Sequence, residues 1–146
     1  MSENQKPNIM KEPIRVLWID DEYELMEPFK NLALLNNIQL VGFKSLTSGV
    51  EELEKNYASY DTVILDAIIL ENENDPEGSE HISHIFRAQE RILRLSRKKK
   101  FDMFVLTGQP EAYNSSVFNM AFSKVYTKGN EKDIERLFED IKSSTA

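Results

Sequence analysis

The chain has 146 residues, of which 40% are hydrophobic and 29% charged, and its 18 Lys and Arg against 25 Asp and Glu give a formal net charge of −7. This composition is typical of one globular domain with a buried core, and it excludes wholesale disorder, while the acidic balance argues against nucleic-acid binding. The absence of cysteine excludes disulfide scaffolds and thiolate metal sites, and no apolar run approaches the ~20 residues that span a bilayer, so we expect a cytoplasmic protein.

The chain begins with a polar segment that lacks the apolar stretch of a signal peptide. We expect residues 1–13 to form a flexible tail and residues 14–146 to form one domain. The first element, "IRVLWI" from Ile14 to Ile19, is short and continuously apolar and predicts a buried strand that has Trp18 in the core.

A helix and a second strand follow. Apolar residues recur at helical spacing from Leu25 to Leu35, where Pro28 is tolerable only in the first turn. Ile38–Phe43 predicts the second strand. Ser48 followed by Glu51 predicts a capping box at the start of a second helix.

The middle of the chain contains an apolar strand that one acid interrupts. We expect a strand over Asp61–Leu70 with Asp66 inside it, followed by the acidic loop Glu71–Gly78. Apolar residues between Ile82 and Leu93 then trace one face of a long helix.

The last third predicts two more strands and two more helices. The strands are Phe101–Leu106 and Phe122–Thr127, with a short helix after Pro110 between them. Apolar spacing predicts a final amphipathic helix around Ile134–Ile141, for which Asn130 is a candidate cap.

Five strands that alternate with five helices predict an α/β fold, a parallel sheet covered on both faces. The carboxyl ends of parallel strands lie at one edge of the sheet, where ligands bind in such folds. Asp20 and Asp21 end the first strand, Asp66 lies near the end of the third, and Thr107 and Lys128 follow the fourth and fifth. We therefore expect three carboxylates, a hydroxyl and an ammonium to meet in one pocket.

These groups have a common chemistry. Clustered carboxylates raise one another's pKa values unless a cation neutralises them, and carboxylate oxygens suit Mg²⁺. A carboxylate can also attack phosphorus to form an aspartyl phosphate, whose oxygens then need a metal, a lysine and a hydroxyl donor.

The set of polar residues at strand ends resembles the signature of the response-regulator receiver domain. The resemblance covers Ile14 to Lys142. It implies a flavodoxin-like, doubly wound sheet of strand order 2-1-3-4-5 with five helices, arranged as three α/β/α layers.

The resemblance also implies a role for each residue. Asp66 would be the phosphoacceptor, Thr107 would contact the phosphoryl group through its hydroxyl, and Lys128 would contact it through its ammonium. The residues implied as Mg²⁺ ligands are Asp20, Asp21, Asp66 and the backbone carbonyl of Ile68.

The function that this resemblance implies is a phospho-accepting receiver of a two-component system. It would be no enzyme in the usual sense, although it would assist its own phosphotransfer and dephosphorylation. The expected partner is a histidine kinase or a histidine phosphotransfer protein, with a homodimer as an additional assembly. The alternative is a pseudo-receiver that binds a partner without phosphorylation. A phosphatase of the haloacid-dehalogenase type is disfavoured, because its nucleophile would lie on the first strand in an Asp-x-Asp pattern.

Three departures from the receiver pattern stand out. The loop after Asp66 is longer and more acidic than usual, and the proline that the family has a few residues after the phosphoacceptor is missing. Val125 stands where the family has an aromatic residue. Gly129 replaces the customary Pro after Lys128. We predict a trans Lys128–Gly129 bond, a loop rearranged around Gly129, which can adopt a positive φ at little cost, and Lys128 still near Asp66.

Two other features are interpreted as solvated helix surface. His81 and His84 lie one helical turn apart without further ligand-type residues nearby. The basic run "RLSRKKK" at 94–100 ends a helix, where cations complement the helix dipole, and contains no aromatic residue.

Overall fold

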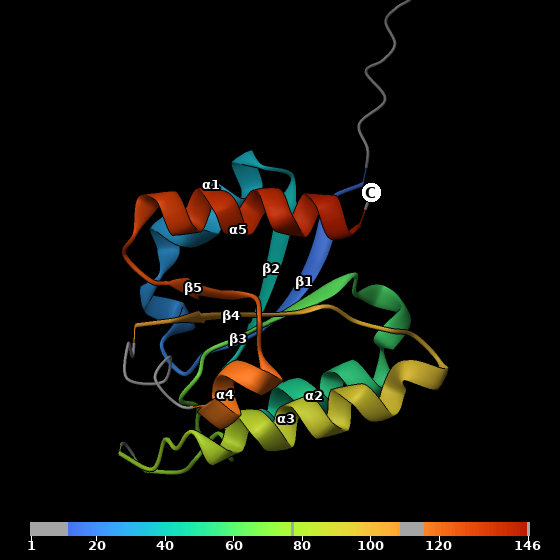
Figure 1. Cartoon of the computed structure of the whole chain (residues 1–146), viewed down its shortest axis with the longest axis vertical. Helices are drawn as coiled ribbons and strands as arrows, with labels where there is room; N and C mark the ends of the chain where they lie inside the picture. Colours follow the sequence, from blue (N-terminus) through green and yellow to red (C-terminus); the bar gives the residue numbers. More distant parts are fainter. Residues whose placement is uncertain (1–11, 77, 109–115, 146) are drawn as a thin grey trace, which may run out of the picture.

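The computed structural model of the chain describes residues 12–76, 78–108 and 116–145, and it shows one parallel five-stranded sheet (Figure 1). The strand order is β2-β1-β3-β4-β5, and every neighbouring pair is parallel. The predicted α/β fold and the order 2-1-3-4-5 are therefore confirmed. The strands are β1 Ile14–Ile19, β2 Ile38–Phe43, β3 Thr62–Leu65, β4 Met103–Thr107 and β5 Val125–Thr127.

Five α-helices cover the sheet in two outer layers, as Figure 1 shows. On one face lie α1 (Glu27–Leu35) and α5 (Glu131–Ser144), and on the other lie α2 (Leu46–Lys55), α3 (Ser83–Arg94) and α4 (Ser116–Ala121). None of the described helices combines the length and the apolar character that crossing a membrane requires.

The continuous apolar character of β1 follows from this two-sided cover. Successive side chains of a strand point to opposite faces, so both faces of a central strand must be apolar. Val16 and Trp18 join the core beneath α1 and α5, whereas Leu17 and Ile19 join the core beneath α2, α3 and α4. Trp18 is fully buried, as predicted.

Helix α1 differs from its prediction in the face that it buries. The helix begins at Glu27 after a 3₁₀ turn, with Pro28 in its first turn as predicted. Its buried residues are Phe29 and Ala33, which lie four apart on one face. Leu25 precedes the helix and is 79% exposed, and Leu35 is 83% exposed, so only part of the expected stripe, Phe29 with the partly buried Met26, faces the core.

The caps of two helices test two predictions. The capping box predicted at Ser48 is wrong, because Ser45 caps α2 by accepting a hydrogen bond of 3.1 Å from the Ser48 N–H. The capping prediction for α5 is confirmed, because Asn130 Oδ1 accepts a 3.0 Å hydrogen bond from the Asp133 N–H.

Three strands have other bounds than predicted, and β3 shows the reason. It ends at Leu65, because the chain then leaves the sheet, and Ile69 forms an antiparallel bridge to His81. β4 begins two residues late, at Met103, and β5 begins only at Val125. Residues 1–11 of the predicted tail and residues 109–115, where the predicted short helix after Pro110 would begin, lie outside the described residues.

Gly49 lets α2 pack closely against the last residue of β1. A Cβ atom at Gly49 would lie 2.5 Å from Ile19 Cγ1, closer than packed atoms come. The glycine therefore sets the depth at which α2 rests on the strand that carries Asp20.

We expect Gly49→Ala to lower the free energy of unfolding by about 1–2 kcal/mol, because overpacking at Ile19 outweighs the higher helix propensity of alanine. Urea denaturation measures the change. Adding Ile19→Val to the alanine variant should recover part of the loss, and a stability equal to or above that of the wild type would contradict the close approach.

Candidate functional site

The carboxyl edge of the sheet brings the predicted polar residues together through backbone hydrogen bonds. The Asp20 N–H donates to the Phe43 carbonyl at 2.9 Å, and the Asp66 N–H donates to the Ile19 carbonyl at 3.0 Å. The Lys128 N–H donates to the Thr107 carbonyl at 3.0 Å. The backbone pairing of the parallel strands therefore places these residues side by side, independently of any contact between their side chains.

The carboxylates of Asp20, Asp21 and Asp66 each offer an oxygen within 4.8 Å of the others. Asp20 and Asp66 are buried, and Asp21 is half-buried at the rim. Such a cluster of like charges in a poorly solvated place is unfavourable unless a cation compensates it.

Lys128 supplies part of that compensation. Its Nζ lies 2.6 Å from Asp20 Oδ2 and 2.9 Å from Asp66 Oδ2. Burial lowers the pKa of Lys128, but the charges of Asp20 and Asp66 outweigh burial and raise it, so the side chain stays an ammonium.

The turn after Lys128 agrees with its prediction. The described residues contain no cis peptide bond, and Gly129 has a φ of 78°, which glycine adopts without strain. The trans bond and the position of Lys128 beside Asp66 are therefore confirmed.

The pKa values of two acids show that one lysine is not enough. Burial raises the pKa of Asp20 to about 6, and the charge of Asp66 adds to this effect, although Lys128 opposes it. Burial also raises the pKa of Asp21 to about 7, helped by a hydrogen bond with Glu80 and by the charge of Glu80. The site therefore still lacks positive charge.

A divalent cation fits the charge and the donor atoms of this site. When ionised, three carboxylates and one ammonium leave a net charge near −2. The Asp20 Oδ2 atom is buried and accepts no well-directed hydrogen bond from the described residues, although it touches the Lys128 ammonium. All the donors are oxygens, which hard cations prefer.

The remaining predicted residues lie at the same edge. Thr107 is buried at the end of β4. Ile68 follows Asp66 by two residues, and its N–H donates to Asp66 Oδ1 at 3.4 Å. The structure thus places all six predicted site residues at the carboxyl edge of the sheet. Their roles as metal ligands and as contacts of a phosphoryl group stay predictions.

A fourth acid, Glu80, influences Asp21, and no motif in the sequence marks it. Hydrogen bonding and the charge of Glu80 help to raise the pKa of Asp21, and hydrogen bonding with Asp21 lowers the pKa of Glu80. The predicted acidic loop covers Glu71–Gly78, and Glu80 lies two residues beyond its end. Only the return of the chain, where the His81 N–H donates to the Ile69 carbonyl at 3.2 Å, brings it to the site.

The two histidines differ from each other. His81 is exposed, as expected. The interpretation of His84 as solvated surface is wrong, because its side chain is only 12% exposed and its Nδ1 lies 2.6 Å from the Ile69 carbonyl oxygen. His84 thus packs α3 against the start of the acidic loop. The basic run at 94–100 is mostly exposed, as expected.

The residues of β5 face as the strand alternation predicts. Tyr126 is buried beneath α5 and its hydroxyl donates to Asp140, whereas the half-buried Val125 packs on the other core. No aromatic side chain of β5 therefore points to the face of Val125.

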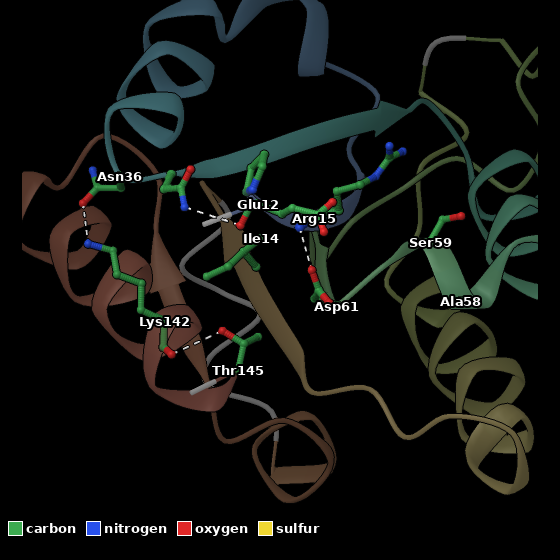
Figure 2. Close-up of a pocket in the computed structure, with 11 residues that line it drawn as sticks. Glu12, Ile14, Arg15, Asn36, Ala58, Ser59, Asp61, Lys142 and Thr145 are labelled. Carbon is green, nitrogen blue, oxygen red and sulfur yellow. Dashed lines mark hydrogen bonds between the residues drawn. The ribbon is translucent and has the colours of Figure 1, made fainter. Parts of the chain in front are cut away.

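A hollow of about 710 Å³ at the amino ends of the strands is a poorer candidate (Figure 2). Its polar groups interact mostly with one another. The Arg15 N–H donates to Asp61 Oδ2 at 2.8 Å, and Lys142 Nζ donates to Asn36 Oδ1 at 2.8 Å (Figure 2). The acid cluster lies at the opposite edge of the sheet. Its buried carboxylates and the raised pKa of Asp20 make it the better candidate for a functional site.

The fold agrees with that of solved receiver domains. No protein-family model and no curated protein matches the chain. The chain is similar to the chemotaxis response regulator CheY4 of Vibrio cholerae, with 14% identity over 88% of this chain and 98% of that chain and a TM-score of 0.63.

Two further structures are similar. The response regulator TrrA of Thermotoga maritima, solved in complex with Mg²⁺-BeF, is 23% identical over 90% of this chain and 98% of that chain, with a TM-score of 0.56. The beryllofluoride-activated NtrC4 receiver domain, a dimer, is 16% identical over 90% of this chain and 95% of that chain, with a TM-score of 0.58. This chain therefore has the receiver-domain fold.

We expect Asp20→Asn to raise the free energy of unfolding of the metal-free protein by about 1–2 kcal/mol, because the variant removes a buried charge that costs more than its ion pair returns. The same variant should gain less stability from Mg²⁺ than the wild type. Urea denaturation in EDTA and in Mg²⁺ measures both. Glu22→Gln, an exposed change of equal charge, is the control, and a variant less stable than wild type in EDTA would count against strain at the site.

We also expect the metal-free protein to become more stable as the pH falls from 8 to 5. The folded state binds protons at Asp20 and Asp21 with pKa values of about 6 and about 7, whereas the pKa of an aspartate in solvent is 3.8. Their stabilising effect is complete below the unfolded pKa and is lost as the pH rises through the folded values. The gain should be about 1–3 kcal/mol, mainly from Asp20, since solvent screens the more exposed Asp21. Denaturation in EDTA that shows falling stability between pH 8 and 5 would contradict this.

Proposed function

We propose that this protein is a phospho-accepting receiver that takes a phosphoryl group onto Asp66 with the help of Mg²⁺. The observation that carries the proposal is the arrangement of Asp66 itself. Its carboxylate lies within 4.8 Å of two further carboxylates and within 2.9 Å of the Lys128 ammonium. The receiver-domain fold supports the same function.

Each residue has a task in the transfer. A carboxylate oxygen of Asp66 forms a bond to phosphorus while the bond from phosphorus to the donor breaks; with a phosphohistidine donor, the departing imidazole nitrogen takes up a proton. Lys128 then offsets the charge of the phosphoryl oxygens, and the Thr107 hydroxyl serves as a hydrogen-bonding partner for one of them. Asp20, Asp21, Asp66 and the Ile68 carbonyl would hold Mg²⁺, which would supply positive charge beside the transferring group.

The donor would be a histidine kinase or a histidine phosphotransfer protein, and the chain would act on no separate substrate. The exposed leucines of α1 offer such a partner an apolar surface. Leu32, Leu34 and Leu35 are 48%, 60% and 83% exposed, and Leu25 lies just before the helix. A homodimer, the state of the NtrC4 receiver, is a further use of such a surface.

A second candidate is a pseudo-receiver that binds a partner without phosphorylation. Val125 favours it, because no aromatic switch residue faces the site from that strand position. The extra acid at the rim, Glu80, also favours it. The two functions share the α1 surface and differ only in the chemistry of Asp66.

Incubation with acetyl phosphate and Mg²⁺ tests the proposal. We expect intact-mass measurement to show one added phosphate, located on Asp66 and removed by hydroxylamine, which cleaves acyl phosphates. Asp66→Asn should abolish it, because an amide is a poor nucleophile. EDTA should abolish it as well.

The control variant is Asp61→Asn, which changes an exposed aspartate at the opposite edge of the sheet. It should be phosphorylated like the wild type. A wild-type protein that neither gains phosphate nor binds beryllofluoride at any Mg²⁺ concentration would reject phosphotransfer in favour of the pseudo-receiver.

A further inference from the structure

The turn that follows β1 sets the direction of two of the three clustered carboxylates. After Asp20 the chain folds back and enters a short 3₁₀ turn, Tyr23–Leu25, and Asp21 lies in this fold. The Tyr23 N–H donates to the Asp20 carbonyl at 3.1 Å, and the Glu22 N–H donates to Asp20 Oδ1 at 2.9 Å. How firmly the turn is held therefore decides how well these acids are aimed at the cluster.

The ring of Tyr23 fastens this turn to β2. It lies over Gly42, where a Cβ atom would come within 2.3 Å of Tyr23 Cδ1 and 2.6 Å of Tyr23 Cγ. Gly42 pairs with Trp18 of β1, and the rings of Trp18 and Tyr23 meet edge to face with their centroids 6.0 Å apart. A glycine in a strand leaves room for such a close approach, so Gly42 provides the seat of the Tyr23 ring.

An ion pair makes a second, weaker connection between the same segments. Glu24 of the turn and Lys44, just after β2, lie 3.0 Å apart, and their side chains are 61% and 40% exposed. Exposed ion pairs contribute little to stability, whereas the ring of Tyr23 is half-buried and packs on the core beneath α1 and α5. The ring is therefore the main attachment of the turn.

We propose that Tyr23 is a positioning residue for the cation site. Its ring, seated on Gly42 and against Trp18, keeps Asp21 and the Oδ1 atom of Asp20 in place for a bound cation. The inference rests on the cation-binding part of the function proposed above. Ligands that are already in place bind a cation more tightly, because less order has to be created on binding. Residues that orient metal ligands commonly change metal affinity 10–100-fold when they are replaced.

Two substitutions of Tyr23 test this role. Tyr23→Ala removes the ring, whereas Tyr23→Phe keeps the ring that makes both contacts. We expect the dissociation constant for Mg²⁺, measured by calorimetry, to rise roughly tenfold in Tyr23→Ala and to stay near the wild-type value in Tyr23→Phe.

The matched control is Tyr57→Ala. It truncates another half-buried tyrosine that begins a 3₁₀ turn, Tyr57–Ser59, but this turn lies at the opposite edge of the sheet. The control should bind Mg²⁺ like the wild type, because a loss of packing far from the acids leaves their direction unchanged.

Gly42→Ala tests the seat from the other side, because the new methyl group must displace the ring. We expect it to weaken Mg²⁺ binding although it keeps every side chain of the turn, so it also decides the question if Tyr23→Ala does not fold. Adding Gly42→Ala to Tyr23→Ala should cause no further loss of affinity, since the methyl group then meets no ring. Trp18 is the only tryptophan of the chain, and its fluorescence should change in both single variants but not in Tyr23→Phe.

Three results would overturn the inference and leave the proposed function in place: wild-type Mg²⁺ affinity in Tyr23→Ala, an equal loss of affinity in Tyr57→Ala, or losses that add in the double variant. A wild-type protein that binds Mg²⁺ but accepts no phosphate would reject phosphotransfer and leave the role of Tyr23 standing. A wild-type protein that binds no Mg²⁺ would reject both.

Discussion

The ion pairs of Lys128 with Asp20 and Asp66 are the interaction on which the site depends. One ammonium joins the ends of β1, β3 and β5, at 2.6 Å and 2.9 Å from two buried carboxylates. Without it, two acids would be buried side by side with no counter-charge, at a cost of several kcal/mol. The raised pKa of Asp20 shows that even with the lysine the site is short of positive charge. A divalent cation is the kind of ligand that would complete this balance, because all the donor atoms are oxygens.

The surrounding fold makes this costly arrangement tolerable. Both faces of the sheet are covered by helices, so the strands are held by large apolar cores and the charged groups are confined to one edge. Close packing fixes the positions of the strand ends, as Gly49 against Ile19 illustrates. The free-energy cost of burying these carboxylates is thus offset by apolar packing elsewhere in the fold. Functional sites in proteins commonly persist in this way.

The rim of the site is where this chain differs from a minimal receiver. The loop that follows β3 adds Glu80 to Asp21, and the exposed leucines of α1 lie on the opposite helical layer. Both features lie at or near the surface of the molecule, whereas Asp20, Asp66 and Thr107 are buried.

The sequence by itself determined the alternation of strands and helices, the polar residues at the strand ends and the turn at Gly129. These depend on local patterns: apolar runs, helical spacing, and the conformational freedom of glycine. The order of the strands was implied only by the resemblance to receiver domains, and the structure confirms it. Only the tertiary structure decided which face α1 buries, where β3 ends, that His84 packs against Ile69, and that Glu80 meets Asp21. Each of these depends on a contact between distant segments, and residue spacing along the chain contains no information about how a loop folds back.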